Sequence, residues 1–173
     1  ARDNALQGAA DAWSQAVPDG RDSIAPRDVA HSWAVLRGLT SHQGAMVAAA
    51  TTSLPEGLGG VRNWDYRYCW LRDTSYALHA ALSVGYRDEA EGFLQWVIDV
   101  TKDDPATLQI MYRVDGGQDL DEFELPHLSG YKHSRPVRIG NAAYHQRQLD
   151  RYGEVVDGAY VHRRFGGVVN GAL

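Results

Sequence analysis

The sequence lacks several features that would place it in a specialised class of protein. Cys69 is its only cysteine, which excludes an intrachain disulfide and a cysteine-rich metal site. No apolar run approaches the ~20 residues of a membrane-spanning helix, so we expect no membrane partner. The net charge of −5 disfavours nucleic acid as a partner, because binding phosphates requires a basic surface. A lone thiol favours a reducing, cytoplasmic compartment.

Signatures of several kinds of catalytic chemistry are missing as well. The seven histidines show no HExxH or similar metal-ligand spacing. Gly57–Gly60 is not followed by the Gly-Lys-Ser/Thr of a phosphate-binding loop. Ser53 and Ser75 lack the Gly-x-Ser-x-Gly setting of a serine nucleophile. We therefore expect no metal site and no cofactor.

The most informative segment that is present is the run RNWDYRYCWLRD, residues 62–73. It combines four aromatic residues with three arginines and two aspartates. Buried Arg and Asp require hydrogen-bond partners, whereas Trp and Tyr favour burial. A cleft for a ligand with apolar faces and many hydroxyl groups satisfies both requirements. Sugars are such ligands, so the run predicts a sugar-binding site.

Arg72 and Asp73 are the candidates for a polar clamp on the sugar. Arg offers a planar fork of donors, and Asp accepts hydrogen bonds from hydroxyl groups. The alternative is that Asp73 caps the helix that follows. For Trp64, Tyr66 and Trp70, the two interpretations are a sugar platform and packing within a loop.

Arg138 is a further candidate binding residue, in the segment Arg135–Asn141. It could reach a ligand from the end of the second long loop, or it could form an ion pair between two loops. The acidic residues 119–124 are more typical of a solvated loop than of a catalytic site.

The apolar pattern indicates an all-α fold. Ala77–Leu82 and Ala90–Val100 follow helical spacing, and Gly85 between them suits a helix C-cap, which predicts a helical hairpin. Further helices are expected at about 3–16, 28–40 and 141–164. The last would have Asn141 as N-cap and one face formed by Leu149, Tyr152, Val156 and Tyr160.

Long connections separate these helices. Residues 41–71 and 102–140 exceed the usual connection of about 4–6 residues, and long loops are often functional. Residues 1–26, which include a turn at Pro18–Gly20, are expected to form an N-terminal helix and linker, and residues 27–173 the main body. The chain does not begin with Met, so we expect it to start inside a longer protein.

Several ordered segments resemble glycoside hydrolase family 15, which contains glucoamylases, glucodextranases and bacterial trehalases. The resemblance extends from about Trp33 to Tyr160. It is carried by these segments: Ala48–Glu56, Gly59-Gly60, the 62–73 run, Leu108–Tyr112, Arg135–Asn141 and Gln148–Glu154.

The resemblance implies an (α/α)6 barrel, of which the chain would form the first portion, and inverting hydrolysis of α-linked glucosides or trehalose. It also implies that Arg72 and Asp73, in the segment that begins with Trp70, bind glucose in the innermost subsite, which Tyr66 lines. The family's catalytic acid is a Glu in a Trp-Glu motif, which does not occur in this sequence. We therefore assign no catalytic residue, expect the remainder of the same polypeptide to supply both carboxylates, and expect the chain alone to be inactive. The alternative is a non-catalytic, all-α module that binds sugar or a partner.

Overall fold

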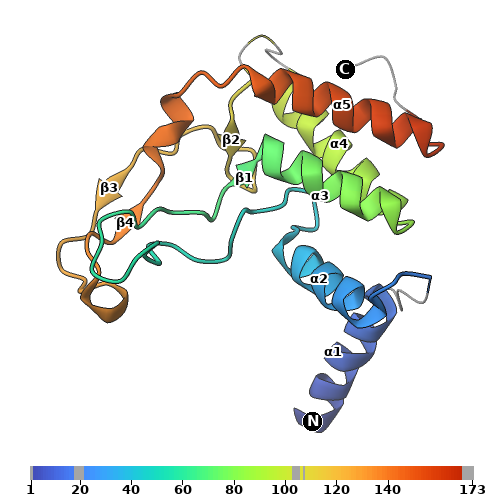
Figure 1. Ribbon diagram of the computed structural model, residues 1–173, viewed down its shortest axis with the longest axis horizontal. Coiled ribbons are helices and arrows are strands. Elements are labelled where there is room, and N and C mark those ends of the chain that lie inside the picture. Colours follow the sequence, from blue (N-terminus) through green and yellow to red (C-terminus); the bar gives the residue numbers. More distant parts are fainter. Residues whose placement is uncertain (1, 18–21, 103–105, 107, 169–173) are drawn as a thin grey trace. The chain divides into compact units, whose positions relative to one another are not determined.

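The computed structural model describes residues 2–17, 22–102, 106 and 108–168, which fall into two compact units, Ala1–Gly38 and Leu39–Leu173. The first unit contains α1 (Arg2–Ala16) and most of α2 (Pro26–Leu39) (Figure 1). Helix α2 begins with Pro26, whose missing N–H would have no helical partner at that position. Both predicted helices are confirmed, whereas the turn expected at Pro18–Gly20 lies outside the described residues. The predicted division at residue 26 stays a prediction.

The second unit is built on the predicted helical hairpin, α3 (Leu71–Ser83) and α4 (Arg87–Thr101). Gly85 has φ +90° and donates its N–H to the Leu82 carbonyl at 3.1 Å, while the Tyr86 N–H reaches the Ala81 carbonyl at 2.9 Å. These two bonds form a Schellman motif, which ends α3 and turns the chain back. The facing apolar side chains are buried in one core, as predicted: Leu78, Leu82, Ala90, Phe93, Leu94 and Val97.

The helix expected at 141–164 is wrong in its first half. Asn141 does act as an N-cap, since its side chain accepts a hydrogen bond from the Ala143 N–H, but it caps only the 3-10 helix η3 (Ala142–His145). Gln146 is then extended (φ −73°, ψ 146°), and the α-helix α5 (Asp150–Arg164) begins four residues later. The extended segment places Gln148 against Arg72.

The packed face of α5 also differs from the expected one. Val155 and Ala159 join the core with α3 and α4, and Gly158 and His162 are buried beside them. The apolar residues Leu149, Tyr152, Val156 and Tyr160 are exposed instead. Small residues face α3, since close approach of two helices leaves little room for larger side chains.

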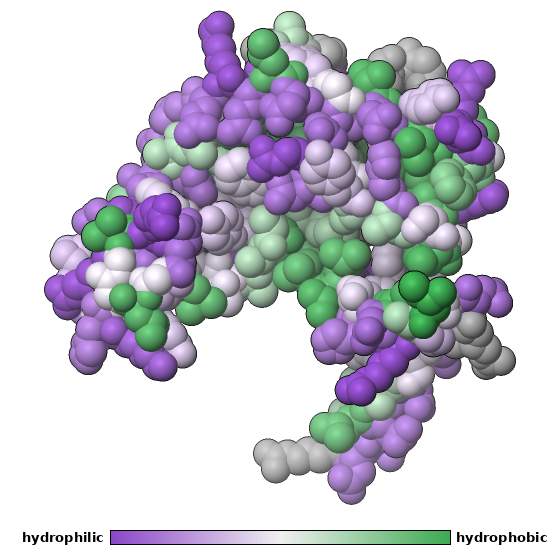
Figure 2. Space-filling model, viewed as in Figure 1, coloured by the Kyte–Doolittle hydropathy of each residue, from purple (hydrophilic) through white to green (hydrophobic). Residues whose placement is uncertain are grey.

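The long loops form two short antiparallel ribbons. In one, β1 (Cys69–Trp70) pairs with β2 (Met111–Tyr112). In the other, β3 (Phe123–Glu124) pairs with β4 (Arg138–Ile139). The 3-10 helix η2 (Tyr131–His133) lies between these two strands in the sequence. Figure 2 shows hydrophilic side chains over most of the end that carries β3 and β4, with hydrophobic ones nearer α3. The predicted all-α class, helices joined by long loops, is confirmed.

The helices of the described residues are too short or too polar to span a membrane.

Candidate functional site

The proposed clamp residues lie where β1 runs directly into α3. Trp70 occupies the N-cap position of α3 with extended backbone (φ −84°, ψ 123°) and makes no side-chain capping bond. Asp73 is the third residue of the helix, in its first turn, so the interpretation of Asp73 as the N-cap is wrong. A carboxylate in the first turn is nevertheless favoured by the helix dipole.

Arg72 is surrounded by polar partners from two segments of the chain. Its Nη2 lies 3.2 Å from Asp73 Oδ2, and its Nη1 donates to Gln148 Oε1 at 3.1 Å. Asp150 Oδ2 lies 3.7 Å from the same Nη1. The guanidinium also lies over the Trp70 ring, 5.5 Å from its centroid. We define the Arg72 cluster as Tyr66, Trp70, Arg72, Asp73, Gln148 and Asp150.

Tyr66 is included in this cluster as a predicted binding residue of the same run, and its ring is exposed. Partial burial raises the pKa of this phenol above 10.0, and the negative charges of Glu56 and Asp73 raise it further. Tyr66 is therefore a protonated hydroxyl group, able to donate, throughout the neutral pH range.

The structure places Trp64 and Arg138 together in a second group. Arg138 Nε lies 3.1 Å from Glu122 Oε1, and its Nη2 lies 3.6 Å from Glu124 Oε1. Its Nη1 donates to the carbonyls of Val61 and Asn63 at 3.0 and 3.3 Å. The guanidinium stacks over Trp64 at 4.7 Å from the ring centroid. We define the Arg138 cluster as Trp64, Glu122, Glu124 and Arg138; it includes the loop–loop ion pair that was the alternative for Arg138.

Asp65 was missed as a structural centre of the 62–73 run. Its side chain is fully buried, and its carboxylate accepts hydrogen bonds from Arg67 Nε at 2.9 Å and Nη2 at 2.8 Å. It also accepts one from the Gly140 N–H at 3.3 Å, which ties the first long loop to the second. The signal in the sequence was an Asp two residues before an Arg within an aromatic run.

Gln148 and Asp150 were also missed as partners of Arg72. Both belong to a segment that carries the family resemblance, but nothing local in the sequence connects them with residue 72. The connection requires α3 and α5 to lie side by side, which is a tertiary contact.

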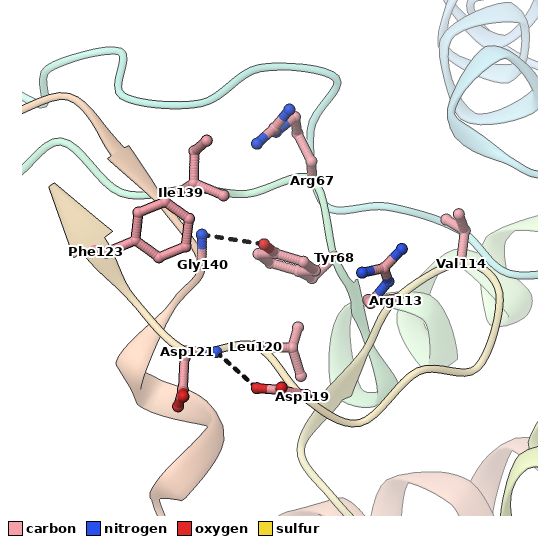
Figure 3. Close-up of a pocket in the computed structure, with 10 residues that line it drawn as sticks. All are labelled: Arg67, Tyr68, Arg113, Val114, Asp119, Leu120, Asp121, Phe123, Ile139 and Gly140. Atoms are coloured by element: carbon pink, nitrogen blue, oxygen red, sulfur yellow. Dashed lines mark hydrogen bonds between the residues drawn. The ribbon is translucent and has the colours of Figure 1, made fainter. Parts of the chain in front are cut away.

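The second unit also contains a cavity of about 480 Å³, and its lining residues do not include the predicted site residues (Figure 3). Phe123 and Ile139 line one side, Arg113 and Val114 the opposite side, and Tyr68 lies between them. Its main charged groups are already engaged: Arg67 with Asp65, Arg113 with Asp115, and Asp121 with Tyr144.

The Asp121–Tyr144 hydrogen bond raises the pKa of the tyrosine to about 12. In the described ranges, no three His, Cys, Asp or Glu side chains are placed to hold a metal ion.

Comparison with known proteins gives a consistent result. The model of the glycosyl hydrolases family 15 matches residues 31–164. The chain is 50% identical over 133 residues to a trehalase of Mycobacterium tuberculosis, covering 75% of this chain and 20% of that protein. A trehalase of Thermoplasma acidophilum is 48% identical over 130 residues, covering 75% and 22%.

The chain thus spans about a fifth of the length of the curated relatives it matches. No solved structure matches it. The helices and the family match together confirm the predicted fold class, an all-α part of an (α/α)6 barrel. The chain belongs to glycosyl hydrolase family 15.

Proposed function

We propose that this chain supplies the glucose-binding residues of an inverting α-glucoside hydrolase, with trehalose as the substrate. The observation that carries the proposal is the Arg72–Asp73 pair, half exposed over the Trp70 ring at the entry to α3. The choice of trehalose is supported by relatives named trehalase that are about half identical to this chain.

The Arg72 cluster has the chemistry that a glucosyl unit requires. Asp73 accepts one hydrogen bond from Arg72, and a carboxylate has about four acceptor sites, so it can also accept from sugar hydroxyl groups. The guanidinium carries donors beyond those used by Asp73 and Gln148. Tyr66 adds a donor hydroxyl group and an exposed ring.

Trp64 and Arg138 complete the predicted set of binding residues. Their contacts support a role in holding the second long loop against residues 61–64. Direct binding of substrate by these two residues stays a prediction, which variants of Arg138 can separate from a structural role.

We further propose that the catalytic acid and base are not among these 173 residues. Inverting hydrolysis needs two carboxyl groups about 6.5–9.5 Å apart, one to protonate the leaving oxygen and one to activate water. The Trp-Glu motif of the family's acid is missing from the sequence, and Glu122 is engaged by Arg138. The chain by itself is then expected to show no turnover.

The test is glucose release by the complete protein from trehalose, maltose and dextran. We expect a preference for trehalose, and at least a ~10²-fold loss of kcat/KM in Asp73→Asn, since each hydrogen bond to a charged group contributes about 1.5–3 kcal/mol. Asp99→Asn, an exposed carboxylate on α4, is the matched control. Saturable binding of glucose without any glucoside cleavage would contradict the proposal and favour a sugar-binding module.

A further inference from the structure

Helices α3 and α5 are joined by a row of polar pairs. Arg72 faces Asp150, the Tyr76 hydroxyl donates to Glu154 Oε1 at 3.3 Å, and His79 Nε2 lies 3.0 Å from Asp157 Oδ2. Each partner lies 78 residues further along the chain, as for Tyr76 and Glu154. A constant separation means that the two helices run parallel, so their first turns lie side by side and Asp150 is next to Arg72.

Gln148 makes the most directed contact with Arg72 at this end of the row. It lies in the extended segment between η3 and α5, where its amide Nε2 donates to Gln146 Oε1 at 2.9 Å. That bond turns the amide oxygen toward Arg72, and this oxygen accepts a hydrogen bond from Arg72 Nη1 at 3.1 Å. Gln146 thus orients the amide of Gln148, and this amide in turn orients the guanidinium of Arg72.

Arg72 needs such support because its side chain is long and partly exposed. The contact with Asp73 comes from the adjacent residue and moves with the same helix turn. Gln148 and Asp150, which come from a distant part of the chain, tie the guanidinium to α5. An error of about 1 Å in the position of a substrate-binding group can reduce the rate ~10²-fold.

We infer that Gln148 is a positioning residue, which with Asp150 holds the Arg72 guanidinium in the orientation that grips glucose. This inference rests on the proposed function of Arg72. It also accounts for the break between η3 and α5, since a helix continuing from Asn141 would carry residue 148 on a different path.

The experiment compares Gln148→Leu with Gln148→Glu in the complete protein. Leucine removes the acceptor and keeps the bulk, whereas glutamate keeps an acceptor for Nη1. We expect Gln148→Leu to lower kcat/KM for trehalose by ~10–10²-fold, and Gln148→Glu to recover most of that loss. Added to Arg72→Lys, the leucine substitution should cause little further loss, because the two residues act as one unit. Gln95→Leu, on the exposed face of α4, is the control for loss of a helix-surface amide.

A crystal structure of Gln148→Leu provides a readout that does not depend on activity. We expect the Arg72 guanidinium to move from its place over the Trp70 ring while α3 and α5 keep their positions. An unmoved guanidinium, or full activity of Gln148→Leu, would overturn the inference but leave the proposed function intact. If the complete protein cleaves no α-glucoside, the proposed function fails, and the crystal structure alone decides whether Gln148 positions Arg72.

Discussion

Two arginines of this chain have similar surroundings and different exposure. Arg72 and Arg138 each lie over a tryptophan ring and each pair with carboxylates. The Arg138 side chain is only 11% exposed, and its nitrogens contact two carboxylates and two backbone carbonyls. The Arg72 side chain is 36% exposed, beside an Asp73 that is 46% exposed.

The difference in exposure indicates that the two arginine side chains have different roles. Arg138 is enclosed by two carboxylates and two backbone carbonyls, although its Nε makes no hydrogen bond, so removing it would leave partly buried acceptors without a donor. Arg72 is coordinated on the side of α5 and open on the other, so it retains donors for a ligand. We infer that the Arg138 cluster contributes mainly to stability and the Arg72 cluster mainly to binding.

The substitution Arg138→Leu, which tests the structural role of Arg138, has the largest expected effect on stability. We expect it to lower the free energy of unfolding by about 2 kcal/mol, because breaking this partly buried ion pair leaves Glu122 with only the Ala142 N–H as a partner. Denaturant titration of the complete protein measures the change. Arg113→Leu removes an exposed pair with Asp115 and should change stability by less than ~1 kcal/mol. Equal effects of the two substitutions would contradict the structural role of Arg138.

Arg72→Lys tests the other half of the comparison. Lysine keeps the charge but cannot reproduce the planar fork of donors. We expect a ~10²-fold loss of kcat/KM on trehalose, with the free energy of unfolding changed by less than ~1 kcal/mol. A large loss of stability together with unchanged kinetics of the remaining folded enzyme would assign Arg72 to structure instead.

Tyr66→Phe sharpens the definition of the Arg72 cluster with a smaller expected effect. Removal of one hydroxyl group should lower kcat/KM by up to ~10-fold, the value of one neutral hydrogen bond. Since the pKa of Tyr66 is raised above 10.0, the hydroxyl group stays protonated, and the loss should be the same from about pH 6 to pH 9. A ratio of wild-type to variant activity that falls as the pH rises across this range would show that the group ionises and is not protected by its neighbours.

Alkylation of Cys69, the buried core residue that precedes Trp70, is the prediction with the smallest expected change. Its thiol is buried, which raises its pKa to about 11, so only about 10⁻³ of it is thiolate at pH 8. We expect very slow alkylation in the wild-type protein, no change in Arg72→Lys, and faster alkylation in Arg138→Leu. Mass spectrometry after timed exposure to iodoacetamide measures the rate. Rapid labelling of the wild-type protein would show that the core around Cys69 opens readily.

The sequence was sufficient for features that depend on neighbouring residues. The α3–α4 hairpin followed from the apolar spacing and from Gly85, because a left-handed residue at a helix end is a local requirement. The predicted helix from Asn141 failed for the complementary reason. The chain leaves the helical path at Gln146, and Gln148 contacts Arg72 on α3; no property of these residues alone indicates such a contact.

The candidate site shows the same division. Tyr66, Trp70, Arg72 and Asp73 were found together because a short segment carries them all. The separation of Trp64 and Arg138 into another cluster was not visible, since Arg138 is 74 residues away from Trp64 in the numbering and meets it through loop packing. Gln148 was missed for the same reason.

By itself, the sequence predicted most of the helices, the family and a set of candidate sugar-binding residues, since periodicity, caps and side-chain chemistry are properties of short segments. The tertiary structure alone decided which arginine is enclosed and which is open to a ligand. Coordination depends on groups brought together from distant parts of the chain, and it is the packing of α5 against α3 that supplies them to Arg72.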